Sequence, residues 1–421
     1  MAESTLQATT KNIVILGGSY AGVSTAHYLL KHAIPKLPDS STYQVILVSA
    51  SSEVLCRPAC PRAMISDDLL PQDKLFVSIP EVFKKHPVNN FQFEHARAEH
   101  VDHTKRTVSI RYEKDEEDEK IIPFHALVIA TGSSTPSPLL SLNKDSAEIR
   151  AQWALFRDAM KKAKSIVIAG GGPAGIETAG ELGEYLNGQP GWFAGKLENP
   201  KVEITVVTSA SQILPLLRSS IAEKAEGYLA RVGVTVVKGT KVTGVSPAES
   251  GTDLALPTKA TVSLSDGTEL DADIYIPAVG MTPNTSFLDK TLLMSDGRVE
   301  TNHSTLRVDK AGDRIYAVGD VGSYARPAVH SILNAVPVVC ANIKRDLLLA
   351  SGEREASLGA ERSFKEDTRE TQMVPIGRSK GVGAAMGYRL PSFLVWLIKG
   401  RDYWLWTTGD LWSGKQWEKE S

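Results

Sequence analysis

The sequence is poor in cysteine, has almost no net charge and lacks any long apolar run. Its three cysteines, Cys56, Cys60 and Cys340, are too few for a disulfide framework and are typical of a reducing compartment. No apolar stretch approaches the roughly 20 residues that a membrane-spanning helix needs. The 47 basic and 49 acidic residues leave a formal charge of -2, without the basic cluster that binds nucleic acid. We therefore expect neither a transmembrane protein nor a nucleic-acid partner.

The N-terminal residues carry no targeting pattern. Residues 1–11 are polar and lack the apolar core of a secretory signal, and Ala2 stands where N-myristoylation requires glycine. We expect a cytoplasmic protein that is not secreted. The alternative is peripheral contact with an organelle or lipid-droplet membrane through the C-terminal segment.

The most informative stretch is an apolar strand, a glycine turn and a helix near the middle of the chain. Residues 166–169 have the β-branched bias of a central parallel strand, and Gly170, Gly172 and Gly175 follow at the spacing G-x-G-x-x-G. The first glycine allows the turn, the second lets backbone approach a pyrophosphate, and the third lets the helix pack on the strand. The helix start then offers free N–H groups to the pyrophosphate. The stretch predicts a dinucleotide site.

A similar unit lies near the N-terminus, where Gly17, Ser19 and Gly22 follow another apolar strand. Ser19 replaces the middle glycine, and its hydroxyl can donate to a phosphate oxygen although it crowds the closest backbone approach. Each copy is followed, at a nearly constant offset, by a second apolar strand that ends in glycine, at 127–132 and at 274–280. Such internal repetition predicts two dinucleotide domains in one chain.

The spacing of these units divides the chain. We predict an α/β fold with two Rossmann-like domains of the glutathione-reductase type, the second inserted in the first, plus a small C-terminal segment. The first domain covers 11–149 and resumes at 288–350, the second covers 150–287, and the C-terminal segment covers 365–421. Neither unit ends its second strand with an acid that would hold a ribose 2′-OH, so the pattern leaves NADH and NADPH undistinguished.

The C-terminal segment differs from the rest in composition. An apolar run at 393–398 stops at Lys399 and Arg401, too short to cross a bilayer. The segment is predicted to form a core lid or a homodimer face, and the alternative is an interfacial membrane contact. It contains five of the seven tryptophans of the chain, namely Trp396, Trp404, Trp406, Trp412 and Trp417.

With these pieces named, the chain resembles the pyridine-nucleotide-disulfide-oxidoreductase superfamily without its catalytic disulfide. Within it, the sequence is similar to the apoptosis-inducing-factor-like group that includes the ferroptosis-suppressor quinone oxidoreductases, and particularly to its fungal branch. The motifs that carry the resemblance are 17–22, 57–62, 170–181, 319–320 and the tail motifs 381–383 and 399–402. The resemblance implies a non-covalent FAD on the first domain, NAD(P)H on the second and a small quinone-type acceptor.

Two departures from the group concern the cysteines and the N-terminus. Cys60 stands where related chains carry alanine, and the myristoyl glycine is absent. Disulfide reductases space their pair as C-x-x-x-x-C, whereas Cys56 and Cys60 are C-x-x-x-C with Pro58 between them. We therefore interpret both as packing thiols, with a redox-active dithiol as the alternative. The proline pair Pro58 and Pro61 argues against a regular helix here.

The resemblance and the motifs together predict the site. Glu177, in the first turn of the second fingerprint helix, is predicted to lie beside the nicotinamide, and Lys399 to lie on the opposite face of the flavin, where it stabilises an anion. The alternatives are a plain helix charge for Glu177 and a solvent-directed Lys399. Asp320 is predicted to accept from a ribityl hydroxyl, with a helix N-cap as the alternative. No metal site is predicted. The predicted cofactor-binding residues are Gly17, Gly18, Ser19, Ala21, Gly22, Ser49, Arg57, Pro58, Thr131, Gly132, Gly170, Gly172, Pro173, Ala174, Gly175, Glu177, Gly280, Gly319 and Asp320.

The function that follows is an FAD-dependent NAD(P)H oxidoreductase with a quinone-type acceptor. An alternative on the same scaffold is a tailoring oxidoreductase that acts on an aromatic polyketide in secondary-metabolite biosynthesis. A death-signalling or nucleic-acid-binding flavoprotein would need a basic stripe, which the charge balance does not provide.

Overall fold

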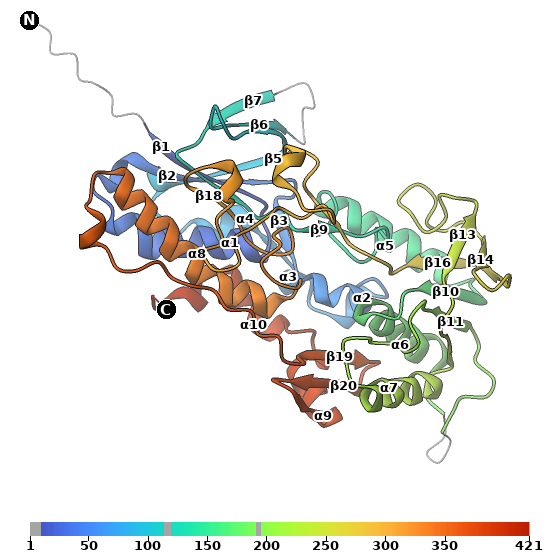
Figure 1. The fold of residues 1–421 in the computed structure, drawn as a ribbon. Helices are drawn as coiled ribbons and strands as arrows, with labels where there is room; N and C mark the ends of the chain where they lie inside the picture. The colour runs from blue at the N-terminus through green and yellow to red at the C-terminus, as the bar shows by residue number, and fades with distance from the viewer. Residues whose placement is uncertain (1–9, 113–118, 191–194, 421) are drawn as a thin grey trace, which may run out of the picture.

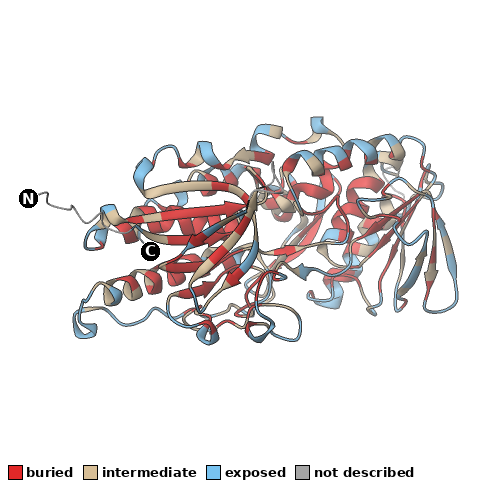
Figure 2. Ribbon diagram, turned by 90° about the horizontal axis from the view of Figure 1, so that it is seen from above, coloured by how far each residue is buried: buried red, intermediate tan, exposed pale blue. Residues whose placement is uncertain are grey.

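The computed structural model describes residues 10–112, 119–190 and 195–420 and contains two α/β domains joined side by side (Figure 1). The polar N-terminus considered above lies outside the described residues, apart from its last two positions. Buried residues follow the sheets and the helix faces packed on them (Figure 2).

The first domain is built on a seven-stranded sheet in the order β18-β8-β1-β2-β5-β6-β7. β1 pairs in parallel with β2 and β8, and its residues Ile13–Leu16 are buried on both sides, as expected of a continuous apolar strand at the centre of a sheet. β6 and β7 extend β5 as an antiparallel meander. The strands are β1 (Lys11–Leu16), β2 (Tyr43–Ser49), β5 (Phe91–Asp102), β6 (Thr107–Tyr112), β7 (Glu119–Pro123), β8 (Ala126–Ile129) and β18 (Ile315–Ala317).

Helices α1 and α8 of the first domain pack on each other against this sheet. α8 begins at Val329 and accommodates Pro337 inside it. A short antiparallel pair, β3 with β4, lies beside them. The elements are α1 (Tyr20–Tyr28), β3 (Glu53–Leu55), α2 (Cys60–Ala63), α3 (Gln72–Leu75), β4 (Phe76–Ser78), α4 (Ile79–Phe83) and α8 (Val329–Ala350).

The second domain is inserted between β8 and β18. The chain leaves the first sheet after β8 and returns at β18, which pairs in parallel with β8. The inserted sheet is parallel in the order β12-β11-β10-β16, with an antiparallel β13-β14-β15 sheet beside it. This arrangement confirms the predicted fold class. The elements are β9 (Ser133–Ser134), α5 (Ser146–Met160), β10 (Ser165–Ala169), α6 (Pro173–Asn187), β11 (Glu203–Val207), α7 (Ser219–Arg231), β12 (Val234–Val237), β13 (Val242–Ser246), β14 (Ala260–Leu264), β15 (Glu269–Ala272), β16 (Ile274–Pro277) and β17 (Thr282–Pro283).

The C-terminal tail contacts both domains. Its antiparallel sheet β19-β20-β21 packs on α6 and α7 of the second domain, and α10 then reaches α1 of the first domain (Figure 1). One apolar core runs from residues 55–76 through the second domain into this tail. The elements are β19 (Gln372–Ile376), β20 (Lys380–Ala385), β21 (Tyr388–Arg389), α9 (Ser392–Val395), the π-helical turn η10 (Trp396–Gly400) and α10 (Leu405–Trp412).

Candidate active site

The turn after β1 requires glycine at two positions. Gly17 has a φ of +108°, which side chains rarely adopt, and a Cβ on Gly22 would lie 1.7 Å from the Gly17 carbonyl oxygen. α1 therefore packs directly on the turn. Gly18 backs onto the end of β2, where a Cβ would lie 2.6 Å from the Ser49 hydroxyl oxygen. Ser19 is the N-cap of α1 in extended conformation, and its side chain makes no capping hydrogen bond.

The turn after β10 repeats this geometry. Gly170 has a φ of +127°, and a Cβ on Gly175 would lie 2.0 Å from the Gly170 carbonyl oxygen. A Cβ on Gly172 would meet no atom within 4 Å, so open space lies beside the backbone at the start of α6. Pro173 and Ala174 form the first turn of that helix. Exposed N–H groups beside open space are what a pyrophosphate needs.

The second apolar strand of each unit, at 127–132 and at 274–280, also ends in a glycine with open space beside it. Gly132 and Gly280 have φ values of +63° and +68°, and neither Cβ would meet an atom within 4 Å. The loops carrying them are joined across the two domains. The Thr131 hydroxyl donates to the Asn284 carbonyl oxygen at 2.7 Å, and the Asn284 side-chain amide donates to the Thr131 carbonyl oxygen at 2.9 Å.

Arg57 reaches this junction from the 3₁₀ turn Arg57–Ala59, which also contains Pro58. Its guanidinium donates to the Ser133 carbonyl oxygen at 3.2 Å and lies 3.8 Å from the Asp320 carboxylate. The Ser133 hydroxyl donates to the same carboxylate at 3.3 Å. A cavity of about 180 Å³ opens between these groups and is lined by Ser133, Met281, Pro283, Asp296, Arg298, Asp320 and Pro327.

Asp320 follows β18 and is not a helix cap. The N-cap of α8 is Ala328, eight positions further along, so the capping alternative is wrong. Gly319, with a φ of +91°, lets the chain pass α1, because a Cβ there would lie 3.0 Å from the Ala21 Cβ. The strand end therefore presents the Asp320 carboxylate to the cavity instead of to a helix.

Glu177 and Lys399 form a buried ion pair. The Lys399 ammonium donates to the Glu177 carboxylate at 2.5 Å and to the Met373 carbonyl oxygen at 3.0 Å, and the two side chains are 7% and 4% exposed. Burial raises the pKa of Glu177 to about 7, although Lys399 lowers it. The prediction that the two residues lie on opposite sides of the flavin, and the alternative of a solvent-directed lysine, are wrong. The physical reason is that β19 packs on α6, which carries Glu177, and η10, which carries Lys399, packs on β19.

Both glycine turns and the inserted domain lie in a part of the sequence that matches a known protein family. Residues 11–337 match the family model of pyridine nucleotide-disulphide oxidoreductases. The chain belongs to this family.

Several relatives match almost the whole chain. It is 64% identical over 415 residues to oxidoreductase phnG of Penicillium herquei, which covers 98% of this chain and 99% of that protein. It is 30% identical to oxidoreductase ptaL of Pestalotiopsis fici, over 92% of this chain and 95% of that protein. Ferroptosis suppressor protein 1 of Xenopus laevis is 26% identical, over 93% of this chain and 92% of that protein. The solved structure of NDH2 from Plasmodium falciparum in complex with NADH has the same fold, with a TM-score of 0.64, 14% identity, and coverage of 98% of this chain and 99% of that chain.

The family uses FAD and NAD(P)H, and the residues present fit both. Each domain offers a glycine turn at a helix start, and the open sides of Gly132, Gly172 and Gly280 leave room for a ligand against the backbone. The Asp320 carboxylate supplies an acceptor for hydroxyl groups beside the cavity. The protein is thus an NAD(P)H-dependent flavoprotein oxidoreductase.

The cysteines lack the properties of a redox pair. Cys56 and Cys60 are free and fully buried, and burial raises their pKa values to about 11 and about 12. Thiolates are therefore scarce at neutral pH. The backbone here is more helical than the prolines suggested, because Pro58 and Pro61 occupy first-turn positions of the 3₁₀ turn and of α2, where no N–H is needed.

Sequence reasoning missed three residues of this junction. Arg62 from α2 donates to both carboxylate oxygens of Glu181 on α6, at 2.9 and 2.7 Å, and the Tyr403 hydroxyl donates to one of them at 3.0 Å. The sequence contained a signal for the helix α6 but none for the segments that pack against it. Glu177 and Glu181, spaced i and i+4, had to share one face of the helix. Their partners come from distant segments, which no local pattern shows.

The end of the tail packs on the first domain. Trp412 is buried with its ring centroid 4.6 Å from that of Tyr20, and its carbonyl oxygen lies 2.8 Å from Nε2 of His27. Trp417 is also buried and lies edge-on to Tyr28. These two tryptophans therefore belong to the core of the first domain.

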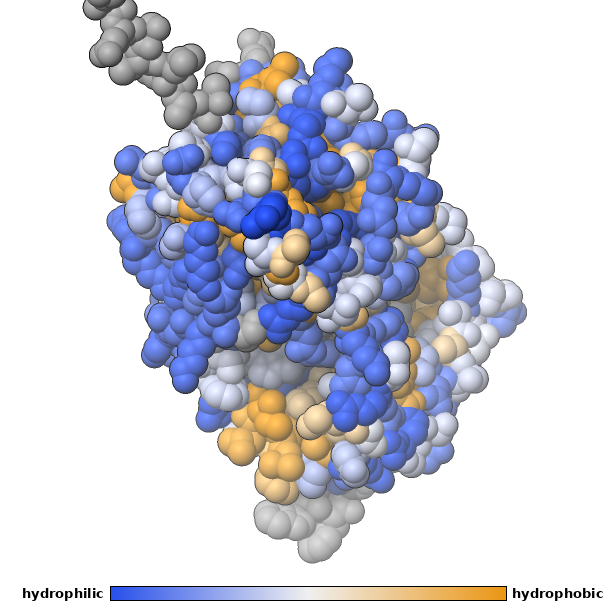
Figure 3. Space-filling model, turned by 60° about the vertical axis from the view of Figure 1, so that its left-hand side comes forward, coloured by the Kyte–Doolittle hydropathy of each residue, from blue (hydrophilic) through white to orange (hydrophobic). Residues whose placement is uncertain are grey.

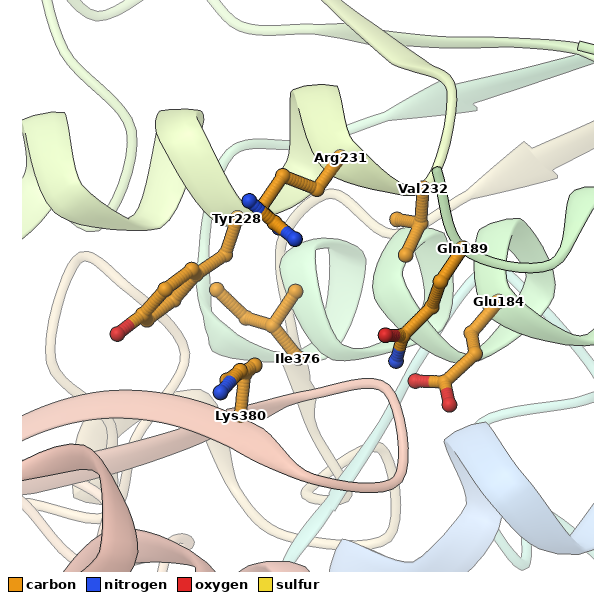
Figure 4. Close-up of a pocket in the computed structure, with 7 residues that line it drawn as sticks. All are labelled: Glu184, Gln189, Tyr228, Arg231, Val232, Ile376 and Lys380. Carbon is orange, nitrogen blue, oxygen red and sulfur yellow. The ribbon is translucent and has the colours of Figure 1, made fainter. Parts of the chain in front are cut away.

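The tail sheet meets the second domain closely. Gly180 permits this contact, because a Cβ there would lie 2.8 Å from the Ile376 side chain. Figure 4 shows the shallow notch left at the edge of this contact, with Ile376 and Lys380 from the tail facing Tyr228 of α7 and Glu184 of α6. Other tail residues are exposed. Apolar side chains gather at the lower end of the molecule, where Figure 1 places α9 (Figure 3), and Phe393 there is 64% exposed.

Within the described ranges, none of the helices is long and apolar enough to cross a membrane. The same ranges contain no cluster of histidine, cysteine and acidic side chains that could hold a metal ion.

Proposed function

We propose that this oxidoreductase delivers the electrons of NAD(P)H to a quinone-type acceptor. The observation that carries the proposal is the buried Glu177–Lys399 pair, which joins the tail to the second dinucleotide domain. A quinone reduced to its hydroquinone takes up protons as well as electrons. A carboxyl group with a pKa of about 7 beside a buried cation suits an acceptor of that kind.

The thiols support a direct route to a small acceptor. A family member that reduces a disulfide needs a reactive thiolate, and burial keeps Cys56 and Cys60 protonated. The resemblance to the ferroptosis-suppressor group points to the same acceptor class. When bound, FAD supplies the two-electron chemistry between NAD(P)H and the acceptor.

The residues of this chain then have separate roles. Glu177, with a pKa of about 7, can take up and release a proton near neutral pH, and Lys399 offers a fixed cation to an oxygen on which negative charge develops. The tail that carries Lys399 also excludes water, because Tyr403 covers Cys56 with its carbonyl oxygen 3.5 Å from the sulfur. Arg57 and Asp320 bind and orient the cofactor on the other side of the junction.

The test separates the two half-reactions of the holoenzyme. Wild type, Lys399→Met and Glu177→Gln are first reduced anaerobically by NADH or NADPH and then mixed with a panel of quinones in a stopped-flow instrument. We expect Lys399→Met to be reduced normally and reoxidised about 100-fold more slowly, the cost of one lost electrostatic contact to a developing anion. We expect Glu177→Gln to slow reoxidation by quinone while FAD stays bound, because it removes the carboxyl group that holds the proton beside Lys399.

A matched control is Lys415→Met, which removes a tail lysine whose side chain is 69% exposed. It should change neither half-reaction. A wild-type holoenzyme that is reduced by NAD(P)H but reoxidised no faster by any quinone than by buffer would show that the acceptor class is wrong. Fast reoxidation by polycyclic aromatic quinones alone would favour the polyketide-tailoring alternative.

A further inference from the structure

Two carboxylates on α6 each face a different buried cation. Glu177 pairs with Lys399 of the tail, and Glu181, one helical turn further, pairs with Arg62 of the first domain. The side chains of Arg62 and Glu181 are 6% and 2% exposed. Two buried anions this close compete for the same cations. Some feature of the site must therefore direct Lys399 to Glu177 and Arg62 to Glu181.

The planar guanidinium of Arg62 matches the two carboxylate oxygens of Glu181 and so determines this pairing. Nε and one Nη donate to the two oxygens of Glu181, and Nη1 donates to the Arg401 carbonyl oxygen at 3.1 Å. The Tyr403 hydroxyl adds a third donor to Glu181, and the guanidinium lies 4.8 Å from the centre of the Tyr403 ring. Glu181 thus receives three hydrogen bonds, two of them from a charged fork.

We propose that Arg62 is a positioning residue which, together with Tyr403, satisfies Glu181 and so commits Lys399 to Glu177 in the acceptor half-reaction. The inference deepens the proposed function, because it assigns what sets the charge of the Glu177–Lys399 pair. Arg62 itself contacts Glu181, Tyr403 and two tail carbonyl groups, and acts on Glu177 through them and through its own charge.

The groups that face Glu177 all enter this account. They are Lys399 from η10, Glu181 on the same helix, Arg62 from α2 and Tyr403 from the tail. Burial raises the pKa of Glu177 most strongly, Lys399 and Arg62 lower it, and Glu181 raises it. Removing Arg62 leaves Glu181 as an unbalanced anion that repels Glu177 or draws Lys399 away, and either effect raises the pKa of Glu177 further.

The test follows the protonation of Glu177 directly, as the carboxylic-acid band in infrared spectra of the holoenzyme that Glu177→Gln removes. For Arg62→Met we expect the pH midpoint of this band to rise by about one unit, within the range that a nearby charge produces. The double variant Arg62→Met/Glu181→Gln removes cation and anion together, and its midpoint should return to the wild-type value. Arg62→Lys, which keeps the charge without the fork, should show a smaller rise.

The pH profile of quinone reduction supplies a second readout. Its midpoint should shift with the infrared band in Arg62→Met, while the KM for NAD(P)H stays unchanged. An unshifted band in Arg62→Met, or the same shift in the double variant, overturns the proposal, because a merely structural role would not be repaired by removing Glu181 as well.

If Arg62→Met does not fold, the proposal can still be tested with Tyr403→Phe, a variant that keeps every charge. Tyr403→Phe removes only one donor from Glu181 and should raise the midpoint slightly, and an unchanged midpoint contradicts the role of Tyr403. Failure of the proposed function gives a different result. If the wild-type holoenzyme reduces ferricyanide but no quinone, the acceptor assignment is wrong, and the infrared comparison still decides the role of Arg62.

Discussion

Removing Lys399 leaves a buried carboxylate without its cation. The ammonium lies 2.5 Å from the Glu177 carboxylate, and both side chains are almost fully buried. Breaking such a pair by deleting one partner costs about 3–5 kcal/mol when the remaining charge stays ionised. Lys399→Met should therefore destabilise the protein, and the amount should depend on whether Glu177 can take up a proton instead.

The free energy of unfolding of Lys399→Met should depend on pH with a definite sign. In wild type, burial already raises the pKa of Glu177 from 4.5 to about 7, and loss of Lys399 raises it further. Above pH 4.5 the folded protein then holds a proton that the unfolded chain has released, so the free energy of unfolding falls as pH rises. Each pH unit above 7 should cost the variant about 1.4 kcal/mol relative to wild type, until its own raised pKa is passed. Two such units give about 3 kcal/mol, in line with the cost of a broken pair.

The assay is thermal unfolding of the holoenzyme at pH 6, 7.5 and 9, compared as melting temperatures because two domains need not unfold in one step. Lys399→Met should melt close to wild type at pH 6 and several degrees lower at pH 9. The double variant Lys399→Met/Glu177→Gln carries no unpaired charge and should be stable at both. An equal loss at pH 6 and pH 9, or a double variant weaker than the single one, would refute the reasoning. Lys415→Met serves as the exposed control.

Three further predictions concern other parts of the molecule. Gly22→Ala should yield colourless protein, since the new Cβ would lie 1.7 Å from the Gly17 carbonyl oxygen and push α1 off the turn; the flavin absorbance of the purified variant checks this. The double replacement of Cys56 and Cys60 by serine should keep most of the NAD(P)H-to-quinone rate, and a charge-transfer band that the reduced wild type shows and the variant lacks would contradict it. Trp412→Ala should cost about 3–5 kcal/mol of packing and make the tail the first site of limited proteolysis; cleavage elsewhere first would argue against a docked tail.

The fold could be predicted because its rules are local. A glycine whose Cβ would overlap the backbone five residues earlier has no substitute, so Gly22 and Gly175 mark the turn from sequence alone. Repetition of that turn then implied two domains, and the confirmed insertion follows from where the repeats stop. The buried part of β1 could be predicted in the same way, since Ile13–Leu16 are buried on both faces and all four are apolar.

The junction of the two domains with the tail could be predicted only in part. Glu177 and Lys399 were singled out, one from its place on the helix and one from resemblance, but they were placed apart and lie together. Glu181 pairs with a residue 119 positions away, and Lys399 with one 222 positions away. A helical face shows which side chains point the same way, and nothing local shows which distant segment will meet them.

The tail has a consequence for synthesis of the chain. Because Lys399 and Tyr403 follow both dinucleotide domains in the sequence, they leave the ribosome after these domains have emerged. A nascent or prematurely terminated chain that ends before Pro391 keeps Glu177 and Glu181 on α6 without two of their partners. Such a chain cannot close the junction without burying unbalanced negative charge, so we expect it to remain sensitive to proteases and to be cleared by quality control. The tail thus makes synthesis of the segment that carries Lys399 and Tyr403 a condition for assembly of the enzyme.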